Sequence, residues 1–183
     1  MDNIFITSDL HFNHVKIMEY CARSRGHFQS MDEMNETLIN NWNSVITPED
    51  HTFVLGDFFM GNVQQTAVPI LNRLNGTKTL ILGNHDRSLM KIPGITEHFH
   101  GVYDYLCFEL DKQTAVIMFH YPIQSWDGKF RGSLHCHGHC HGTPTGIQGR
   151  IKDVGVDGNN LKPYNLKDLA ETMKQIPTHR ADY

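Results

Sequence analysis

Three short runs of apolar and β-branched residues occur in the first half of the chain, and each one ends at a cluster of polar side chains. Residues 4–8, 52–55 and 78–82 have the length and composition of buried strands. Their polar ends are Asp9 with His11, Gly56 with Asp57, and residues 83–86. The pattern therefore predicts strands that each deliver a functional loop.

The stretches between these strands predict helices. Met31, Met34, Leu38, Trp42 and Val45 recur at helical spacing, and Ser30 with Glu33 reads as a capping box. Shorter helices are expected over 15–21 and over 63–74, the latter kinked or split at Pro69. Alternating strands and helices indicate parallel strands, and ligands collect at the carboxyl ends of such strands.

The second half is richer in strand patterns. Residues 102–110 and 114–120 predict an antiparallel hairpin, and further strands are expected over 133–138 and 150–154. Asn165 begins a predicted final helix that ends near residue 176. We expect one domain over residues 1–183, of the α/β class, with two β layers that meet where the polar loops converge.

Composition narrows the functional classes. The 183 residues carry a net charge of −4, which disfavours a protein that grips polyanions nonspecifically. No apolar run approaches the ~20 residues of a membrane span, and the N-terminus lacks a signal pattern. We expect a cytoplasmic protein with no membrane partner.

The cysteine pattern indicates neither a disulfide framework nor a zinc ribbon. Cys21, Cys107, Cys136 and Cys140 are too few for a secreted scaffold of this length. Cys136 and Cys140 form one close pair, whereas a zinc ribbon needs two. Reduced thiols are therefore expected.

Histidine is the unusual residue, with 13 in the chain and five between positions 120 and 141. Imidazole is the commonest side-chain metal ligand. The groups at predicted strand ends offer seven oxygen or nitrogen ligands, which suit two divalent ions that share one carboxylate. These residues are Asp9, His11, Asp57, Asn84, His120, His139 and His141. Ligation without thiolate favours Mn²⁺, with Fe, Zn²⁺ and Ni²⁺ as alternatives.

Five motifs in order give the chain a resemblance to the calcineurin-like metallophosphoesterases. They are SDLHFNH (8–14), GDFF (56–59), GNHDR (83–87), HYP (120–122) and GHCH (138–141). Five motifs in sequence are specific, whereas a single Gly-Asn-His-Asp is more often a turn that caps a strand. The resemblance implies two stacked mixed β-sheets flanked by helices, the sandwich of that superfamily.

The resemblance also implies roles for the candidate residues. Asp9, His11 and His141 would hold a first metal, Asn84, His120 and His139 a second, and Asp57 would bridge the two. A hydroxide between the metals would attack the phosphorus, and His85 would protonate the leaving oxygen as general acid.

Substrate contacts are less sharply indicated. Asn13 and His14 follow the first metal loop, and Arg23 and Arg25 are candidates for a phosphate clamp, although loop arginines are commonly just solvated. Asp86 and Arg87 are interpreted as a cap and a solvated charge. His135 and His137 are left out of the ligand set because Gly138 before His139 fixes the register of the motif.

Departures from the pattern of the protein phosphatases in this superfamily narrow the expected substrate. Met60 and Gly61 stand where those enzymes have an Asp that orients the histidine and an Arg that grips phosphate, and Asp86 stands where they have Glu. We therefore expect a phosphodiesterase acting on a small nucleotide-like substrate, such as a cyclic nucleotide. A nuclease, which would need a basic groove or an aromatic platform, a phosphomonoesterase and a metal-free adaptor are the alternatives.

Overall fold

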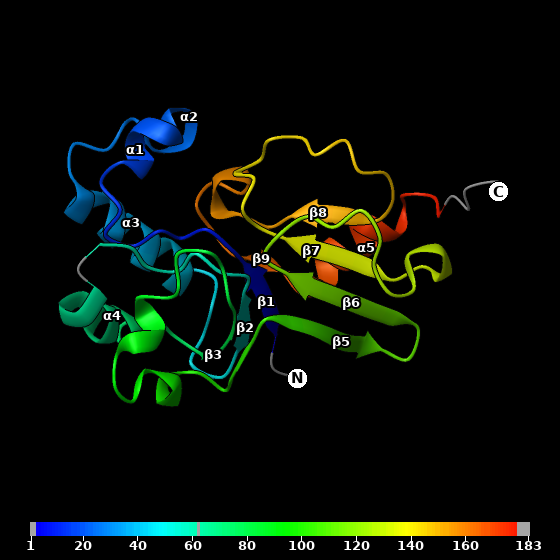
Figure 1. Ribbon diagram of the computed structural model, residues 1–183, viewed down its shortest axis with the longest axis horizontal. Helices are drawn as coiled ribbons and strands as arrows, with labels where there is room; N and C mark the ends of the chain where they lie inside the picture. The colour runs from blue at the N-terminus through cyan, green and yellow to red at the C-terminus, as the bar shows by residue number, and fades with distance from the viewer. Residues whose placement is uncertain (1–2, 62, 179–183) are drawn as a thin grey trace.

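Two β-sheets stacked against each other form the centre of the computed structural model, which describes residues 3–61 and 63–178 (Figure 1). The first sheet has the order β4-β3-β2-β1-β9. Its strands are β1 (Ile4–Thr7), β2 (His51–Val54), β3 (Thr77–Ile81), β4 (Gly101–Tyr103) and β9 (Tyr164–Asn165). Strands β1 to β4 are parallel, and β9 runs antiparallel to β1. The predicted parallel arrangement of the first three strands is confirmed.

The second sheet has four strands in the order β5-β6-β7-β8. They are β5 (Tyr105–Asp111), β6 (Thr114–Phe119), β7 (Leu134–His137) and β8 (Ile151–Asp153). The predicted antiparallel hairpin is confirmed for β5 and β6, but its expected first residues were misplaced. Val102 belongs to β4 of the other sheet, because the chain changes sheets at Asp104.

The helices lie mainly on the far side of the first sheet from the second sheet (Figure 1). They are α1 (Ile17–Tyr20), α2 (Ala22–Arg25), α3 (Met31–Asn43), α4 (Val63–Leu71) and α5 (Leu166–Lys174), with short 3-10 turns η1 (Leu89–Lys91), η2 (Ile95–His98), η3 (Lys129–Arg131) and η4 (Val156–Gly158). The hydroxyl of Ser30 accepts a hydrogen bond from the backbone N–H of Glu33, as the capping box predicts. None of the helices in the described ranges is both long and apolar enough to span a bilayer.

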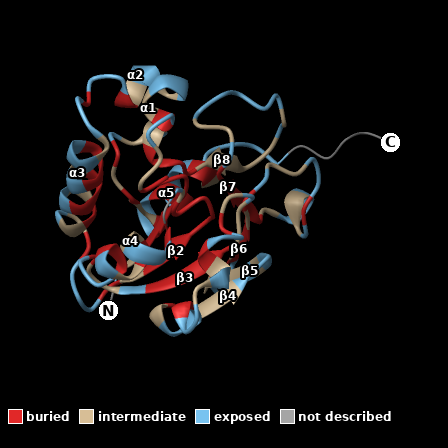
Figure 2. Ribbon diagram, turned by 60° about the vertical axis from the view of Figure 1, so that its left-hand side comes forward, coloured by how far each residue is buried: buried red, intermediate tan, exposed pale blue. Residues whose placement is uncertain are grey.

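Successive side chains of the buried strands point to opposite faces of the first sheet, so the core has two layers. Phe5, Val54 and Leu80 face the layer under α3 and α4, where Trp42 and Leu38 are fully buried. Their neighbours in sequence point the other way, into the layer between the two sheets, which α5 closes; these neighbours are Ile6, Phe53 and Ile81. Figure 2 shows this buried interior in red beneath an exposed rim. The sheets thus hold their strand ends rigidly, and the strand ends carry the polar loops.

Candidate metal centre

The loops that follow β1 and β2 lie side by side. The backbone N–H of Asp9 donates to the carbonyl of Gly56 at 3.1 Å, and that of His11 donates to the carbonyl of Asp57 at 3.0 Å. These bonds extend the parallel pairing of the two strands past their ends. Asp9, His11 and Asp57 are consequently almost fully buried, unlike most loop residues.

The candidate ligands have an unusual backbone. Of the eight described non-glycine residues with positive φ, five belong to the predicted ligand set: Asp9, His11, Asp57, His139 and His141. Left-handed conformations cost energy for residues with a Cβ and persist only where the surroundings enforce them, commonly at functional sites. The backbone strain therefore indicates a functional site at these loops, and this evidence does not depend on any sequence motif.

Asp86 fastens two of the loops together, so the interpretation of this residue as a simple cap was incomplete. Its carboxylate is fully buried and accepts hydrogen bonds from the backbone N–H groups of Gly83, Asp57 and Phe58, at 2.8, 2.9 and 3.0 Å. Burial raises the pKa of Asp86, which these three donors oppose. The side chain fixes the loop after β3 against the loop after β2.

Glycine is required where the loops touch. A Cβ at Gly138 would collide with Ser8 and would lie 2.6 Å from Asp9 Oδ2, and a Cβ at Gly83 would lie 2.6 Å from the backbone nitrogen of Asp57. Because glycine has no Cβ, the backbone at Gly138 can approach the buried carboxylate of Asp9, and the backbone at Gly83 can approach that of Asp57. The glycine in each of these two motifs is therefore required for steric reasons.

Asp9, His11 and His141 form a first group, in which one potential ligand atom from each lies within 4.8 Å of the others. Burial raises the pKa of Asp9 to about 7, and burial together with the nearby charge of His141 lowers the pKa of His11 to about 2. His11 Nε2 is a buried nitrogen with no hydrogen-bond partner among the described residues. A buried carboxylate and an orphaned imidazole nitrogen fit a bound cation.

Asp57, His120 and His139 form a second group with the same spacing of potential ligand atoms. His120 Nδ1 lies 2.7 Å from the carbonyl oxygen of Leu55, which can only accept, so Nδ1 carries the proton. The unprotonated Nε2 then lies 3.0 Å from the side-chain Oδ1 of Asn84, so both atoms can offer a lone pair to one cation.

Asp57 lies between the groups. Its Oδ2 is 3.7 Å from His11 Nε2 and 3.5 Å from His120 Nε2. Its Oδ1 accepts a hydrogen bond from the backbone N–H of His85 at 2.9 Å, which orients the carboxylate. All seven predicted ligands are thus brought to one place, although their role as ligands stays a prediction.

The predicted acid, His85, lies at the rim of both groups. Its imidazole is 36% exposed, and Nε2 is 4.0 Å from Asp57 Oδ2. The ring of His85 lies 5.6 Å from that of His11 and 6.3 Å from that of His14, measured between centroids. This position is open to substrate and adjacent to the candidate ligands.

His14 and Asn13, two of the predicted substrate contacts, lie close to the site, but their side chains have different hydrogen-bond partners. His14 Nδ1 is 3.1 Å from His11 Nδ1, so the ring of His14 lines the site and can accept a hydrogen bond from the Nδ1–H of His11. Burial lowers the pKa of His14, which favours that neutral, accepting form. The Asn13 amide is used inside the protein, since it donates to Thr66 and accepts from Asn35. These two bonds orient the Asn13 amide, and its contact with substrate stays a prediction.

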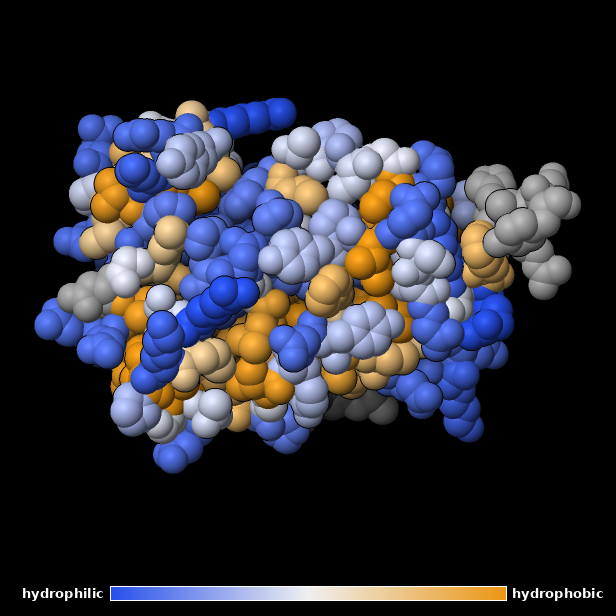
Figure 3. Space-filling model, in the orientation of Figure 1, coloured by the Kyte–Doolittle hydropathy of each residue, from blue (hydrophilic) through white to orange (hydrophobic). Residues whose placement is uncertain are grey.

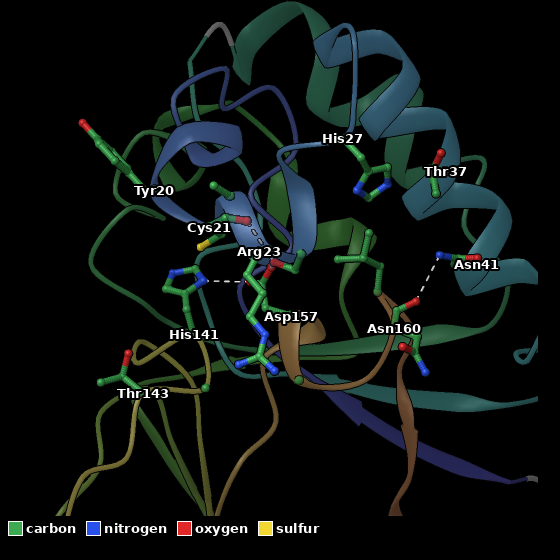
Figure 4. A pocket seen from close by; sticks show the side chains of 15 residues that line it. Tyr20, Cys21, Arg23, His27, Thr37, Asn41, His141, Thr143, Asp157 and Asn160 are labelled. Carbon is green, nitrogen blue, oxygen red and sulfur yellow. Dashed lines mark hydrogen bonds and ion pairs between the residues drawn. The ribbon is translucent and has the colours of Figure 1, made fainter.

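The prediction that Arg25 clamps phosphate is wrong. Its side chain is completely buried, and its guanidinium donates to both carboxylate oxygens of Asp157 and to the carbonyl oxygens of Asp9 and Leu10. A guanidinium with these partners has no face for a substrate. Arg23 is exposed instead and lines an open cavity of about 820 Å³ beside His141 (Figure 4).

Asp157 is a residue of the candidate site that the sequence did not reveal. Its Oδ2 lies 2.8 Å from His141 Nδ1, and Figure 4 shows the two side chains joined across the cavity wall. Although burial opposes both shifts, this contact raises the pKa of His141 to about 10 and, with Arg25, lowers the pKa of Asp157. A carboxylate behind a ligating histidine orients the ring and strengthens it as a ligand.

The residues that were left out of the ligand set have other partners. His135 is fully buried, with Nδ1 near the carbonyl of Ile117 and Nε2 accepting from the backbone N–H of Ile123.

The four cysteines are unpaired. Cys21 is the one cysteine in a potential ligand group within the described ranges, together with His141 and Asp157, and no group there contains Cys136 or Cys140.

The fold and the site together define a two-sheet α/β protein with a candidate metal centre at its strand ends. The chain belongs to the calcineurin-like phosphoesterase family, whose model matches residues 3–179. This is a family of metal-dependent phosphoesterases, and the stacked mixed sheets flanked by helices are its fold, as the motifs predicted.

Several relatives cover nearly the whole chain. An uncharacterised protein of Methanocaldococcus jannaschii is 36% identical over 96% of this chain and 93% of its own length. The gene 66 protein of Mycobacterium phage L5 is 30% identical over 86% and 87%. The crystal structure of a protein of unknown function from Aquifex aeolicus superposes with a TM-score of 0.75 at 25% identity, covering 94% of this chain and all of that one.

We predict that Asp157→Asn weakens binding of Mn²⁺ to the protein by about 10- to 100-fold, because His141 loses the carboxylate that orients it. Titration calorimetry of the chelator-treated protein would measure the affinity. Glu36→Gln is the matched control, because Glu36 also forms a two-point ion pair with an arginine, Arg73, but on the exposed surface. Equal affinities for the two variants would contradict the assignment.

The same pair predicts a pH dependence for the stability of the metal-free protein. Because the pKa of His141 is raised in the folded protein, its ion pair with Asp157 stabilises the fold fully at pH values below the ordinary histidine pKa of 6.5. This stabilisation is lost as the pH rises through about 10. Thermal unfolding in chelator should therefore show the largest gap between wild type and Asp157→Asn from about pH 4 to 6.5, narrowing toward pH 10. A gap that stays constant over the alkaline range would show that His141 is not involved.

Proposed function

We propose that this protein hydrolyses phosphodiester bonds at a centre of two divalent metal ions. The observation that carries the proposal is the position of Asp57, whose Oδ2 lies between His11 of one ligand group and His120 of the other. A carboxylate shared between two ligand groups is the arrangement that two ions about 4 Å apart require.

The ligand assignment follows the two groups. Asp9, His11 and His141 would hold one ion, Asn84, His120 and His139 the other, and Asp57 both. Mixed carboxylate, amide and imidazole ligation favours Mn²⁺, with Fe, Zn²⁺ and Ni²⁺ as alternatives. When bound, such ions lower the pKa of water and neutralise phosphoryl oxygens, which is the chemistry that hydrolysis of a phosphoester needs.

His85 supplies the proton that the leaving oxygen requires. Its backbone N–H is anchored to Asp57 Oδ1, so the loop is fixed, while its imidazole stays 36% exposed and can meet a substrate. An alkoxide is a poor leaving group, and a positioned acid contributes most where the leaving group is poor.

The charges around the site support a diester in preference to a monoester. Among the described residues, Arg25 is the one arginine that is buried near the centre. Its guanidinium donates to Asp157 and to two carbonyl oxygens and therefore cannot neutralise the second charge of a monoester. A diester carries a single negative charge. Within the diesters, cyclic nucleotides and other small nucleotide-like molecules suit the open cavity beside His141.

The activity is tested with chelator-treated protein to which metals are returned singly. We expect recovery with Mn²⁺ at two ions per chain by elemental analysis, and faster hydrolysis of bis-p-nitrophenyl phosphate than of p-nitrophenyl phosphate. A panel of cyclic mono- and dinucleotides then narrows the substrate. One ion per chain, or preference for the monoester, would contradict the proposal.

The acid role of His85 has its own test. His85→Ala should bind two ions as the wild type does, yet lose about 100-fold or more in kcat on esters with an alkyl leaving group and much less on p-nitrophenyl esters. The reason is that p-nitrophenolate leaves without a proton. Equal losses on both kinds of ester would show that His85 does not act as the acid.

A further inference from the structure

Three aromatic rings form a row that leads away from the candidate metal centre along the outer surface of the second sheet. Tyr121 follows β6, and its ring centroid lies 4.8 Å from that of His139 and 4.9 Å from that of His120. Phe119 lies next, at 5.6 Å from Tyr121, and Tyr105 follows at 6.2 Å from Phe119. The row therefore begins at two candidate ligands of the second metal.

Strand geometry puts these rings on one surface. Phe119 and Tyr105 are directly opposite each other in the β5–β6 pair, and Tyr121 is two residues beyond Phe119. The inner face of the same strands, with Val116, Met118 and Phe108, packs into the core between the sheets. The row thus lies on the outward face of the second sheet. Figure 3 shows the surface of the molecule in the orientation of Figure 1, where hydrophobic and hydrophilic residues alternate over the second sheet.

The rings are exposed although they are large. Tyr105 is 44% exposed and Tyr121 is 37% exposed, while Phe119 is half-buried between them. A cross-strand aromatic pair stabilises a sheet, which explains Tyr105 with Phe119. It does not explain Tyr121, which lies beyond the strand and against His120 and His139.

We propose that this row binds the bases of a short, single-stranded nucleotide phosphodiester whose scissile phosphate lies at the metal centre. Exposed aromatic side chains stack on any base, and a base next to a scissile phosphate would meet Tyr121 first. This inference rests on the proposed function and narrows its substrate class.

Charge limits the length of the ligand. Burial raises the pKa of the Tyr105 phenol, and the nearby Cys107 and the negative charge of Asp127 raise it further. The nearby Arg131 forms an ion pair with Asp127 at 2.9 Å, so its positive charge is partly offset. A net charge of −4 disfavours the binding of a long polyanion. The row therefore suits a few bases rather than an extended strand.

The test compares tetrathymidylate with an abasic tetramer that has the same phosphates and no bases. We expect kcat/KM on tetrathymidylate to exceed that on the abasic tetramer about tenfold or more. Tyr105→Ala should lower the value for tetrathymidylate several-fold and leave that for the abasic tetramer unchanged. Tyr121→Ala should lower the value for tetrathymidylate by a larger factor than the value for the abasic tetramer, so that the ratio of the two values falls. Tyr121→Trp keeps a stacking surface and should retain the wild-type preference.

Tyr103→Ala is the control. Tyr103 is 43% exposed, like the row, but its ring lies over Gly101 of its own strand in the first sheet. It should behave as wild type. Fluorescence anisotropy with labelled tetrathymidylate in chelator measures base binding without hydrolysis, and there too the alanine variants of the row should bind more weakly.

The outcomes separate this inference from the proposed function. Hydrolysis of both tetramers at equal rates, unaffected by the tyrosine variants, would overturn the base-binding row and leave the phosphodiesterase standing. Failure to hydrolyse either tetramer or bis-p-nitrophenyl phosphate would contradict the proposed function, and the anisotropy measurement would still decide whether the row binds bases. Self-association that the Tyr105 variant abolishes, without base binding, would identify the row as a contact between chains.

Discussion

The structure depends on two carboxylates that are buried among imidazoles at the seam between the sheets. Asp9 and Asp57 are almost inaccessible to water, and the group nearest to Asp57 Oδ2 in the first cluster is a neutral His11. Burial of a charge without a partner is costly, so these side chains need a positive charge between them. The loops, their glycines and their strained backbone can be understood as the means of holding the carboxylates in place until a cation binds.

A framework of hydrogen bonds behind the ligands makes that arrangement rigid. Asp86 joins the loops after β2 and β3, and Arg25 with Asp157 joins the loop after β1 to the ring of His141. Among the described residues, Asp86 and Arg25 belong to none of the potential ligand groups, whereas Asp157 belongs to one with Cys21 and His141. All three side chains orient the candidate ligands, which is how a site is held within the narrow tolerances that coordination requires.

The parts of this picture that the sequence predicted are those with local signals. Strands that end in Gly-Asp or Gly-Asn were recognisable, and so was the capped helix over residues 31–43, because each combines a periodic pattern with a specific terminal residue. The two-residue strand β9 was missed because so short a strand has no periodicity. Val102 was assigned to the hairpin because nothing in the alternating pattern reveals that the chain changes sheets at Asp104.

The site was predicted less completely than the fold for a similar reason. Arg25 and Asp157 are 132 positions apart, and no spacing rule relates them, so the arginine was interpreted as a candidate phosphate clamp. The aromatic row was equally invisible, since Tyr105 and Tyr121 become neighbours of Phe119 only through strand pairing. Long-range pairing of this kind is a property of the folded chain alone.

The left-handed backbone at the candidate ligands has a consequence for how such a protein can change over time. At Asp9, His11, Asp57, His139 and His141 a glycine would relieve conformational strain while removing a ligand. Thermostability and metal retention are therefore opposed at four of these positions, and His141 is the exception because its ion pair with Asp157 stabilises the protein without metal. A lineage that no longer needed the metal would gain by drifting toward glycine at the other four.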